Sequence, residues 1–486
     1  MSLVLSRLYF RMADLFRGTP VARHLRDLEK SQWNGPETLQ AATAAALVEV
    51  LKVAWTDVPF YRERLWEPGK IRPETAFEAL AAAPVLTRAQ LFDHRDALRS
   101  RGEVGRTRRG RAGGAGGEAL ELLLTRDFLA RTEAAQWRGR AWWGMLRGDP
   151  MVALWGRDIT DRRMAERIAR RERPRNWLRI SALDLGQKDL AEHIRAIGSF
   201  RPEYIYGYGS AIYQLALFCS EHQLRLPAGI RAVFFTTDTL LGFQRRLVEE
   251  TFRAPTAYEQ GSCETGAFAF ECREGGTHIA AENVHVEILR GDRPVAEGED
   301  GEMAVTVLHN RAMPLIRYAT GEWARLLGGR CACGRHLPRI AAAQVRMVDL
   351  VRTSRGRAAS GHLFDLILME LIDRGIRGIR QFLAVQKGLD RFVIQVVPGP
   401  GLDPACLDVF DRRLREKLGR QIDVEFEIVP RIPPDPSGRM QCFRCDIAQP
   451  GASSAPAVEA HDALSLAGAA GRPRGPSVNS QDPSGK

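Results

Sequence analysis

The chain has 486 residues, of which 44% are hydrophobic, so it can bury a large core, and its length predicts roughly two to four domains. Its net charge of +11 favours anionic partners, such as nucleotides, coenzyme A, nucleic acid or an acidic membrane surface. Basic and aromatic residues do not alternate in any compact tract, which argues against a nucleic-acid partner.

The segment MSLVLSRLYFRMADLF, residues 1–16, mixes apolar side chains with Arg7 and Arg11 and predicts a short amphipathic helix. It lacks the features of a secretory signal. Two roles stay open for this helix, packing against the domain or peripheral contact with a membrane. No apolar run approaches the ~20 residues of a membrane span, so we expect no transmembrane segment and a cytoplasmic location. We therefore expect the eight cysteines to be thiols or metal ligands rather than disulfides.

Regular elements follow in chain order. Apolar residues recur at helical spacing over 35–55, where Pro36 opens a predicted helix. Strands and helices alternate further on, which favours a parallel sheet with ligand sites at the carboxyl ends of its strands. The expected strands are 204–208, 231–238 and 254–261, and the expected helices are 210–220, capped by Ser210, and 239–252. Residues 285–289 and 301–308 predict a more antiparallel continuation of the sheet.

After Asp349 the pattern predicts a compact α+β unit of about a hundred residues, a plausible size for a small domain. Its expected helices are 362–374 and 404–419, and its expected strands are 381–388, 391–398 and 423–430. From Gln449 onward the chain is rich in Ala, Gly, Ser and Pro with few large apolar residues, which is typical of a disordered tail.

Two motifs stand close to predicted strands. In NRAMPLIRYATGE, residues 310–322, Arg317 and Tyr318 precede a Thr-Gly turn that ends at Glu322. A carboxylate just past a strand end suits two ribose hydroxyls, although a solvated turn acid beside a packing arginine has the same pattern. QGSCETG, residues 260–266, follows the strand expected at 254–261.

These two motifs, together with other segments that follow one another along the chain, resemble the adenylate-forming superfamily. The resemblance is to the phenylacetate–coenzyme A ligase branch and its capsule-biosynthesis, CapK-like relatives. The similarity runs from about Leu28 to Asp446. The segments that carry it, besides the two motifs, are DVPFYRERL (57–65), PVLTRAQL (84–91), EYIYGYGSAIYQLA (203–216), FFTTDTL (234–240), CACGRHLP (331–338) and PPDPSGRMQ (433–441).

The resemblance implies an α/β fold with a large multi-sheet N-terminal domain and a small, mobile α+β C-terminal domain. The expected parts are 1–100, the helical part of the large domain; 101–348, the adenylate-forming core; 349–447, the small domain; and 448–486, the disordered tail.

It also implies a reaction. An ATP-dependent ligase would activate a small carboxylic acid as acyl-AMP, releasing pyrophosphate, and pass the acyl group to coenzyme A, a carrier-protein thiol or a sugar amine, releasing AMP. The resemblance to the CapK-like relatives also implies a role within polysaccharide assembly. The alternative is a degenerate member that binds nucleotide or acyl ligand with little turnover. A basic membrane-surface or nucleic-acid binder is a third hypothesis that rests on charge alone.

The resemblance gives individual positions a role. The loop 112–117, with Gly113, Gly114, Gly116 and Gly117, would wrap the β- and γ-phosphates of ATP, and Glu264 would hold Mg²⁺. Gly261 and Ser262 would border the adenine and the acyl carbonyl, next to Gln260. Glu322 would bind the ribose, Arg346 would lie at the hinge, and Arg439 would contact the forming adenylate. Tyr208, Gly209 and Ser210 would lie near the acyl pocket.

Several of these positions depart from the family pattern. The usual hydroxyl positions of the loop are Ala112, Gly113, Ala115 and Gly116, so the backbone amides could bind phosphate while donors are missing. Gln260 replaces an aromatic residue, Glu322 an aspartate and Arg439 a lysine, and arginine is not equivalent to lysine. Arg106, Arg108, Arg109 and Arg111 before the loop could compensate, although a solvated basic loop has the same composition.

Cysteine spacing predicts a metal site. Cys272 and His278 are separated by five residues and Cys331 and Cys333 by one, so together they offer three thiolates and an imidazole. Such a set suits a closed tetrahedral zinc site, whereas Cys-x-Cys alone is compatible with two buried thiols. Relatives in the resembled branch can carry a structural metal at corresponding positions, so we expect structural Zn²⁺.

Overall fold

The computed structural model describes residues 3–17, 20–62, 64–112, 120–155, 162–182, 184–237, 240, 242–341, 350–355, 358–374, 376, 378–399, 402, 405–432 and 442–447. Its contacts divide the chain into Met1–Cys445 and Asp446–Lys486. The expected tail, 448–486, lies outside the described residues. The expected boundaries after residues 100 and 348 stay predictions.

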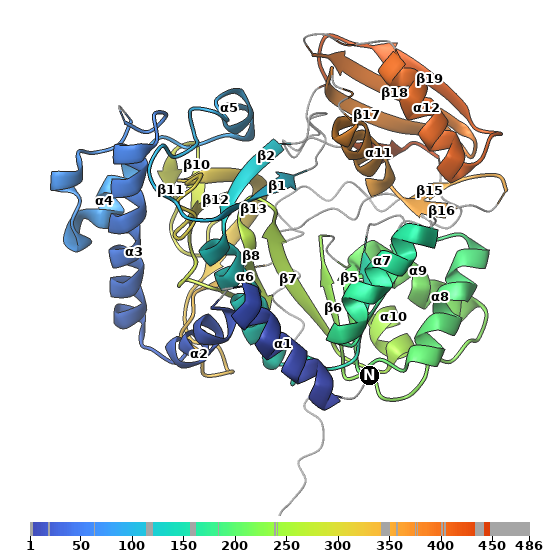
Figure 1. Ribbon diagram of the computed structural model, residues 1–486, viewed down its shortest axis with the longest axis horizontal. Helices are drawn as coiled ribbons and strands as arrows, with labels where there is room; N and C mark the ends of the chain where they lie inside the picture. Colours follow the sequence, from blue (N-terminus) through green and yellow to red (C-terminus); the bar gives the residue numbers. More distant parts are fainter. Residues whose placement is uncertain are drawn as a thin grey trace, which may run out of the picture. The chain divides into compact units, whose positions relative to one another are not determined.

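Helices dominate the first hundred residues (Figure 1). They are α1 (Leu3–Arg17), α2 (Val21–Ser31), α3 (Pro36–Asp57), α4 (Ala76–Ala81) and α5 (Arg88–Asp93), with 3₁₀ turns at Pro68–Lys70 and Pro73–Thr75. The helices expected at residues 1–16 and 35–55 are confirmed, and Pro36 is the first residue of α3.

Among the described helices, α3 alone is long and apolar enough to cross a membrane by length and composition. It buries Leu47, Val50 and Leu51 in a hydrophobic cluster that includes Leu120 of a distant strand. A helix of a protein core passes the same composition test, so the finding is weak evidence for a span.

Twelve strands form one sheet, in the order β11-β10-β12-β13-β14-β9-β8-β7-β6-β5-β3-β4. Strands β3 to β7 pair in parallel, and the strands from β8 onward pair antiparallel, as the sequence pattern predicts. The bounds are β3 (Met151–Trp155), β4 (Trp177–Ser181), β5 (Tyr204–Tyr208), β6 (Ala232–Thr236), β7 (Thr256–Ser262), β8 (Gly266–Glu271), β9 (Thr277–Ile279), β10 (Val284–Arg290), β11 (Arg293–Pro294), β12 (Gly301–Val307), β13 (Tyr318–Leu327) and β14 (Arg339–Ala341).

Five longer helices accompany these strands, namely α6 (Arg126–Ala141), α7 (Arg162–Glu172), α8 (Gln187–Phe200), α9 (Gly209–Glu221) and α10 (Gly242–Phe252), with a 3₁₀ turn at Arg173–Arg175. The helix α9 begins earlier than expected. Tyr208, not Ser210, is its N-cap, because the extended backbone ends at Tyr208 and Ser210 already lies buried in the first turn.

The arginine-rich segment before the glycine loop is a strand rather than the expected solvated loop. β1 (Thr107–Ala112) pairs antiparallel with β2 (Leu120–Thr125), so that Ala112 faces Leu120. Arg108 and Arg109 are exposed on this strand, where Arg109 pairs with Glu121 across the ladder at 3.4 Å. The pairing with an apolar partner strand is the reason that the arginines are extended, since β2 buries Leu120, Leu122 and Leu124.

The C-terminal elements follow the predicted order. They are β15 (Leu350–Arg352), β16 (Ala358–Ser360), α11 (His362–Asp373), β17 (Ile379–Gly388), β18 (Arg391–Pro398), α12 (Ala405–Leu418), β19 (Asp423–Ile428) and β20 (Phe443–Cys445). Four of these strands form a sheet in the order β19-β18-β17-β20. Phe364, Phe382, Phe392 and Phe410 are buried in its core, which joins α11 and α12 to the sheet.

Candidate functional site

The short turn between β7 and β8 carries Glu264 at the carboxyl end of the parallel strand β7. The hydroxyl of Ser262 accepts hydrogen bonds from the backbone N–H of Glu264 and of Thr265, both at 3.2 Å. Ser262 therefore shapes the turn that positions Glu264, a role that a hydroxyl beside a turn commonly takes.

The carboxylate of Glu264 is buried and paired. Arg88 Nη1 lies 2.5 Å from Glu264 Oε1, and the hydroxyl of Tyr318 donates to the same oxygen at 3.2 Å. Burial, together with the charge of Glu264, raises the pKa of Tyr318, so its hydroxyl keeps its proton and remains a donor. Both contacts use Oε1, and neither uses Oε2.

Sequence reasoning gave Arg88 no role, although its local signal is clear. Thr87 is the N-cap of α5, and its hydroxyl accepts from the N–H of Gln90 at 3.2 Å while the Gln90 side chain accepts from the N–H of Thr87 at 2.9 Å. This reciprocal capping box fixes the first turn of α5, which begins at Arg88. Leu86 is bridged to Tyr318, so the start of α5 lies beside the start of β13.

Glu322 does not lie in a turn past a strand end, as the sequence predicts, but inside β13. The pairing of β12 with β13 shifts its register between Glu302 and Ala304. Gly321 lies on β13 opposite this irregularity, and its φ is +73°. The Thr-Gly pair thus forms a bulge within the strand, because Gly321 takes the left-handed backbone that glycine tolerates.

Gln260 connects the two motifs. Its Nε2 donates to Glu322 Oε2 at 2.7 Å, so the structure brings the expected ribose carboxylate next to the expected adenine border. Gln260 is 3% exposed, and among the described residues its Oε1 has no hydrogen-bond partner. A buried amide oxygen without a donor is costly, so this atom is available to a ligand that donates a hydrogen bond.

Gly261 is explained by packing alone. A Cβ at this position would overlap with Cα of Ala267 and the carbonyl oxygen of Gly266 on the neighbouring strand β8. The backbone of β7 therefore comes too close to β8 for any other residue.

Arg317 is the packing arginine that the sequence left open. Its guanidinium is buried, pairs with Glu287 at 3.2 Å and donates to the carbonyl oxygens of Ala81 and Ala83. These contacts hold α4 against the sheet, so Arg317 contributes to the fold beside the site.

Six of the expected site residues lie outside the described residues, namely Gly113, Gly114, Gly116, Gly117, Arg346 and Arg439. Within the described part of the site, the structure brings Glu264 together with Tyr318 and Gln260 together with Glu322.

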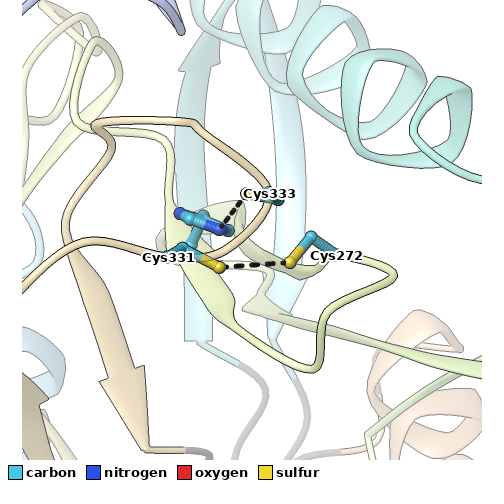
Figure 2. A group of neighbouring side chains, drawn as sticks. Cys272, Cys331 and Cys333 are labelled. Carbon is cyan, nitrogen blue, oxygen red and sulfur yellow. Dashed lines mark hydrogen bonds between the residues drawn. The ribbon is translucent and has the colours of Figure 1, made fainter. Parts of the chain in front are cut away.

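The four predicted metal ligands also come together, although they lie up to about sixty positions apart. Cys272 follows β8, His278 lies in β9, and Cys331 and Cys333 belong to the connection from β13 to β14. Their donor atoms all lie within 4.8 Å of one another, so this group could hold a metal ion. Figure 2 shows the sulfur of Cys331 pointing at that of Cys272, 3.7 Å away.

The surroundings orient these ligands. His278 Nδ1 hydrogen-bonds the carbonyl oxygen of Leu337 at 3.2 Å, which turns Nε2 toward the sulfur of Cys333, also at 3.2 Å. Burial lowers the pKa of His278 to about 4, so the imidazole is neutral, the form that binds a metal. A Cβ on Gly276 would lie 2.9 Å from the sulfur of Cys331, so the turn before β9 must be glycine to leave the cluster its space.

The chain is similar to known proteins in sequence and in fold. Residues 357–444 match the CapK C-terminal domain family. Protein CapK of Staphylococcus aureus is 23% identical over 302 residues, which cover 61% of this chain and 65% of that protein. The phenylacetate–coenzyme A ligase of Escherichia coli (strain K12) is 38% identical over 76 residues, 15% of this chain and 17% of that protein. The chain therefore matches less than two thirds of the length of either curated relative.

A crystal structure of 2-hydroxyisobutyryl-CoA ligase in the postadenylation state, in complex with R3-HIB-AMP, superposes with a TM-score of 0.54. The two are 18% identical, and the match covers 86% of this chain and 92% of that chain. The chain therefore has the adenylate-forming fold. Its α/β architecture, with a separate four-stranded sheet in the C-terminal part, is the fold class that the resemblance predicts.

Proposed function

We propose that this chain is an ATP-dependent adenylate-forming ligase that activates a small carboxylic acid as acyl-AMP and passes the acyl group to a thiol. The observation that carries the proposal is the pairing of Glu264 with Tyr318 and of Gln260 with Glu322, with Gln260 in β7 and Glu264 just beyond its carboxyl end, within a fold shared with acyl-CoA ligases. In sheets of this kind ligands bind beyond the carboxyl ends of the parallel strands. Coenzyme A or a carrier-protein thiol is the proposed acceptor.

Glu264 is the proposed ligand of Mg²⁺ through Oε2, the oxygen that neither Arg88 nor Tyr318 contacts. One carboxylate fits this role, because Mg²⁺ in nucleotide sites takes one or two carboxylates and otherwise binds phosphate oxygens and water. When bound, Mg²⁺ neutralises charge on the phosphates of ATP. Arg88 and Tyr318 would hold the carboxylate in one orientation during the reaction.

Glu322 is the proposed ribose ligand, and Gln260 positions it through the 2.7 Å hydrogen bond to Oε2. The unpartnered Oε1 of Gln260 would accept a hydrogen bond from the bound nucleotide, which removes the cost of leaving it buried and unsatisfied. An aromatic residue stands at this position in the resembled family, and Gln260 would instead act by hydrogen bonding.

For the residues outside the described part, the roles stay those implied by the resemblance. Gly113, Gly114, Gly116 and Gly117 would bind the β- and γ-phosphates by backbone N–H groups, while Arg346 and Arg439 would contact the ribose–phosphate region. The connection 113–119 joins β1 and β2, whose ends are paired at Ala112 and Leu120.

The residues Cys272, His278, Cys331 and Cys333 fit a structural zinc ion. Tetrahedral coordination with Zn–S bonds of about 2.3 Å separates two sulfurs by about 3.8 Å, and Cys272 and Cys331 are 3.7 Å apart. A disulfide would bring them to about 2.05 Å. Four protein ligands leave no open position, so the zinc would stabilise the fold rather than take part in the reaction.

A second candidate function is a degenerate member of the same fold. The observation that favours it is the glycine loop, whose usual hydroxyl positions are Ala112, Gly113, Ala115 and Gly116. Loss of one donor to a transition state costs about 2.7–4 kcal/mol, so two losses would slow the reaction by about 10⁴-fold or more. A role in polysaccharide assembly rests on the resemblance to CapK-like proteins alone.

Pyrophosphate release from ATP, measured across a panel of small carboxylic acids with and without coenzyme A, separates the two functions. The ligase hypothesis predicts release that depends on one or a few acids. Release that no acid stimulates, in a protein that still binds ATP in a calorimetric titration, would instead support the degenerate member.

A further inference from the structure

Helix α1 presents an apolar face to solvent. Its large apolar side chains that are between 41% and 82% exposed are Val4, Leu5, Leu8, Met12, Leu15 and Phe16. At 100° per residue these six positions fall within one arc of about 120°. A continuous apolar strip of this kind on one helix marks a surface that contacts something apolar.

The opposite face of α1 fixes the helix to the domain, so the strip keeps its outward direction. Phe10 is buried, and its ring lies 5.7 Å from that of Trp137 on α6 and 6.4 Å from that of Trp177 on β4. Two ion pairs add to this packing, Arg147 with Asp14 at 2.6 Å and Arg7 with Asp149 at 3.4 Å.

Positive charge borders the strip. Arg11 is exposed on α1 next to the apolar arc, and α1 contacts the 3₁₀ turn Arg173–Arg175, which directly follows α7. Exposed side chains there include Arg167, Arg170 and Arg173. The acidic residue of α1, Asp14, faces the domain and is neutralised by Arg147. The surface is therefore apolar and cationic, which complements an anionic lipid headgroup layer.

We propose that α1 docks the protein on an anionic lipid bilayer, with Val4, Leu5, Leu8, Met12, Leu15 and Phe16 entering the headgroup region and the neighbouring arginines pairing with lipid phosphates. A second copy of the chain fits this strip less well. A helix of 15 residues is about 22 Å long and about 10 Å wide, which offers roughly 220 Å² where a stable dimer needs about 800 Å² from each partner.

The test is co-sedimentation of the full chain with vesicles, either phosphatidylcholine alone or equal parts of phosphatidylcholine and phosphatidylglycerol. We expect binding to the anionic vesicles and weakening by salt. Leu8→Glu should lower the partition coefficient at least about tenfold, because it removes apolar contact and adds a repelled charge. Arg11→Gln should lower it about fivefold, the contribution of one arginine near an anionic surface.

Leu389→Glu is the matched control, because Leu389 is an exposed leucine in the β17–β18 hairpin and should leave binding unchanged. Identical thermal melting of Leu8→Glu and the wild type, measured by circular dichroism, shows that the fold is kept. Failure of the wild type to bind anionic vesicles, or equal binding by Leu8→Glu, would overturn the proposal. A dimer in gel filtration that Leu8→Glu dissociates, without vesicle binding, would assign the strip to a second copy instead.

Discussion

The Glu264 side chain is 6% exposed and takes its charge compensation from Arg88, which is 37% exposed. Removing one partner of a fully buried ion pair costs about 3–5 kcal/mol, and the exposure of Arg88 lets water replace part of that loss. We therefore expect Arg88→Met to lower the free energy of unfolding by about 1–2 kcal/mol, and Arg88→Lys to lower it less. Urea denaturation measures both. Equal stability of Arg88→Met and the wild type would show that Glu264 does not depend on this partner.

His309 gives the stability of the fold a pH dependence. Its Nε2 lies 2.8 Å from the carbonyl oxygen of Glu282. Burial, with Arg131 nearby, lowers the pKa of His309 to about 4. In the unfolded chain the imidazole has its ordinary pKa of about 6.5, so the unfolded state binds a proton there at a higher pH than the folded state does. The free energy of unfolding therefore decreases as the pH falls from about 6.5 to 4.

We expect the His309 contribution to this loss to be about 1–3 kcal/mol, and His309→Gln to remove it while the amide keeps a donor for Glu282. Urea denaturation at a series of pH values measures the slope. The control is His222→Gln, at an exposed histidine beside Phe218. A slope that His309→Gln leaves unchanged would contradict the assignment.

At the scale of elements, the close approach of β7 and β8 depends on Gly261. Gly261→Ala would place a methyl group against the backbone of Ala267, and overpacking of this kind costs about 1–3 kcal/mol. Gly198→Ala is the matched control, since a Cβ there meets nothing within 4 Å and alanine favours the helix α8. Thermal unfolding should show a lower midpoint for the first variant and an equal or higher one for the second. The reverse order would contradict the strand packing described for Gly261.

The elements themselves were largely predictable, because hydrophobic periodicity survives in a single sequence. The helix opened by Pro36 and the alternation from Tyr204 to Ser262 are examples, and both are confirmed. The prediction was wrong where pairing with a neighbouring strand determines the backbone conformation. The arginine segment became β1 because β2 lies beside it, and Glu322 stayed inside β13 because a bulge absorbs Gly321. Such effects come from a partner strand and leave no local pattern.

Arg88 shows that contacts within the site, too, cannot be predicted from the local sequence. Its capping box is visible in the letters TRAQ, but nothing local connects α5 to a glutamate 176 positions away. The four metal ligands were found from spacing and resemblance, and the fold confirms that their donor atoms meet. That they hold zinc stays a prediction.

At the scale of the whole molecule, a zinc ion would tie the β8–β9 turn to the β13–β14 connection. We expect the purified protein to contain equimolar zinc by atomic emission, and chelation to lower its melting temperature. Cys331→Ser should lose both the metal and this stability. Cys406→Ser, which changes a buried thiol in the C-terminal core, is the control that should keep its zinc. A Cys331→Ser protein that melts like the wild type, without metal in either, would contradict the zinc site.

Glu264, held by Arg88 and Tyr318, is the proposed centre of an ATP site, and ATP–pyrophosphate exchange measures whether the reaction depends on it. With a carboxylic acid that supports exchange in the wild type, Glu264→Ala should lower the rate about 10²–10³-fold, the loss expected when one group that stabilises the transition state is removed. Glu282→Gln, at a carboxylate paired with Arg138, should keep the rate if the variant folds. Exchange that persists at the wild-type rate in Glu264→Ala would contradict the assignment.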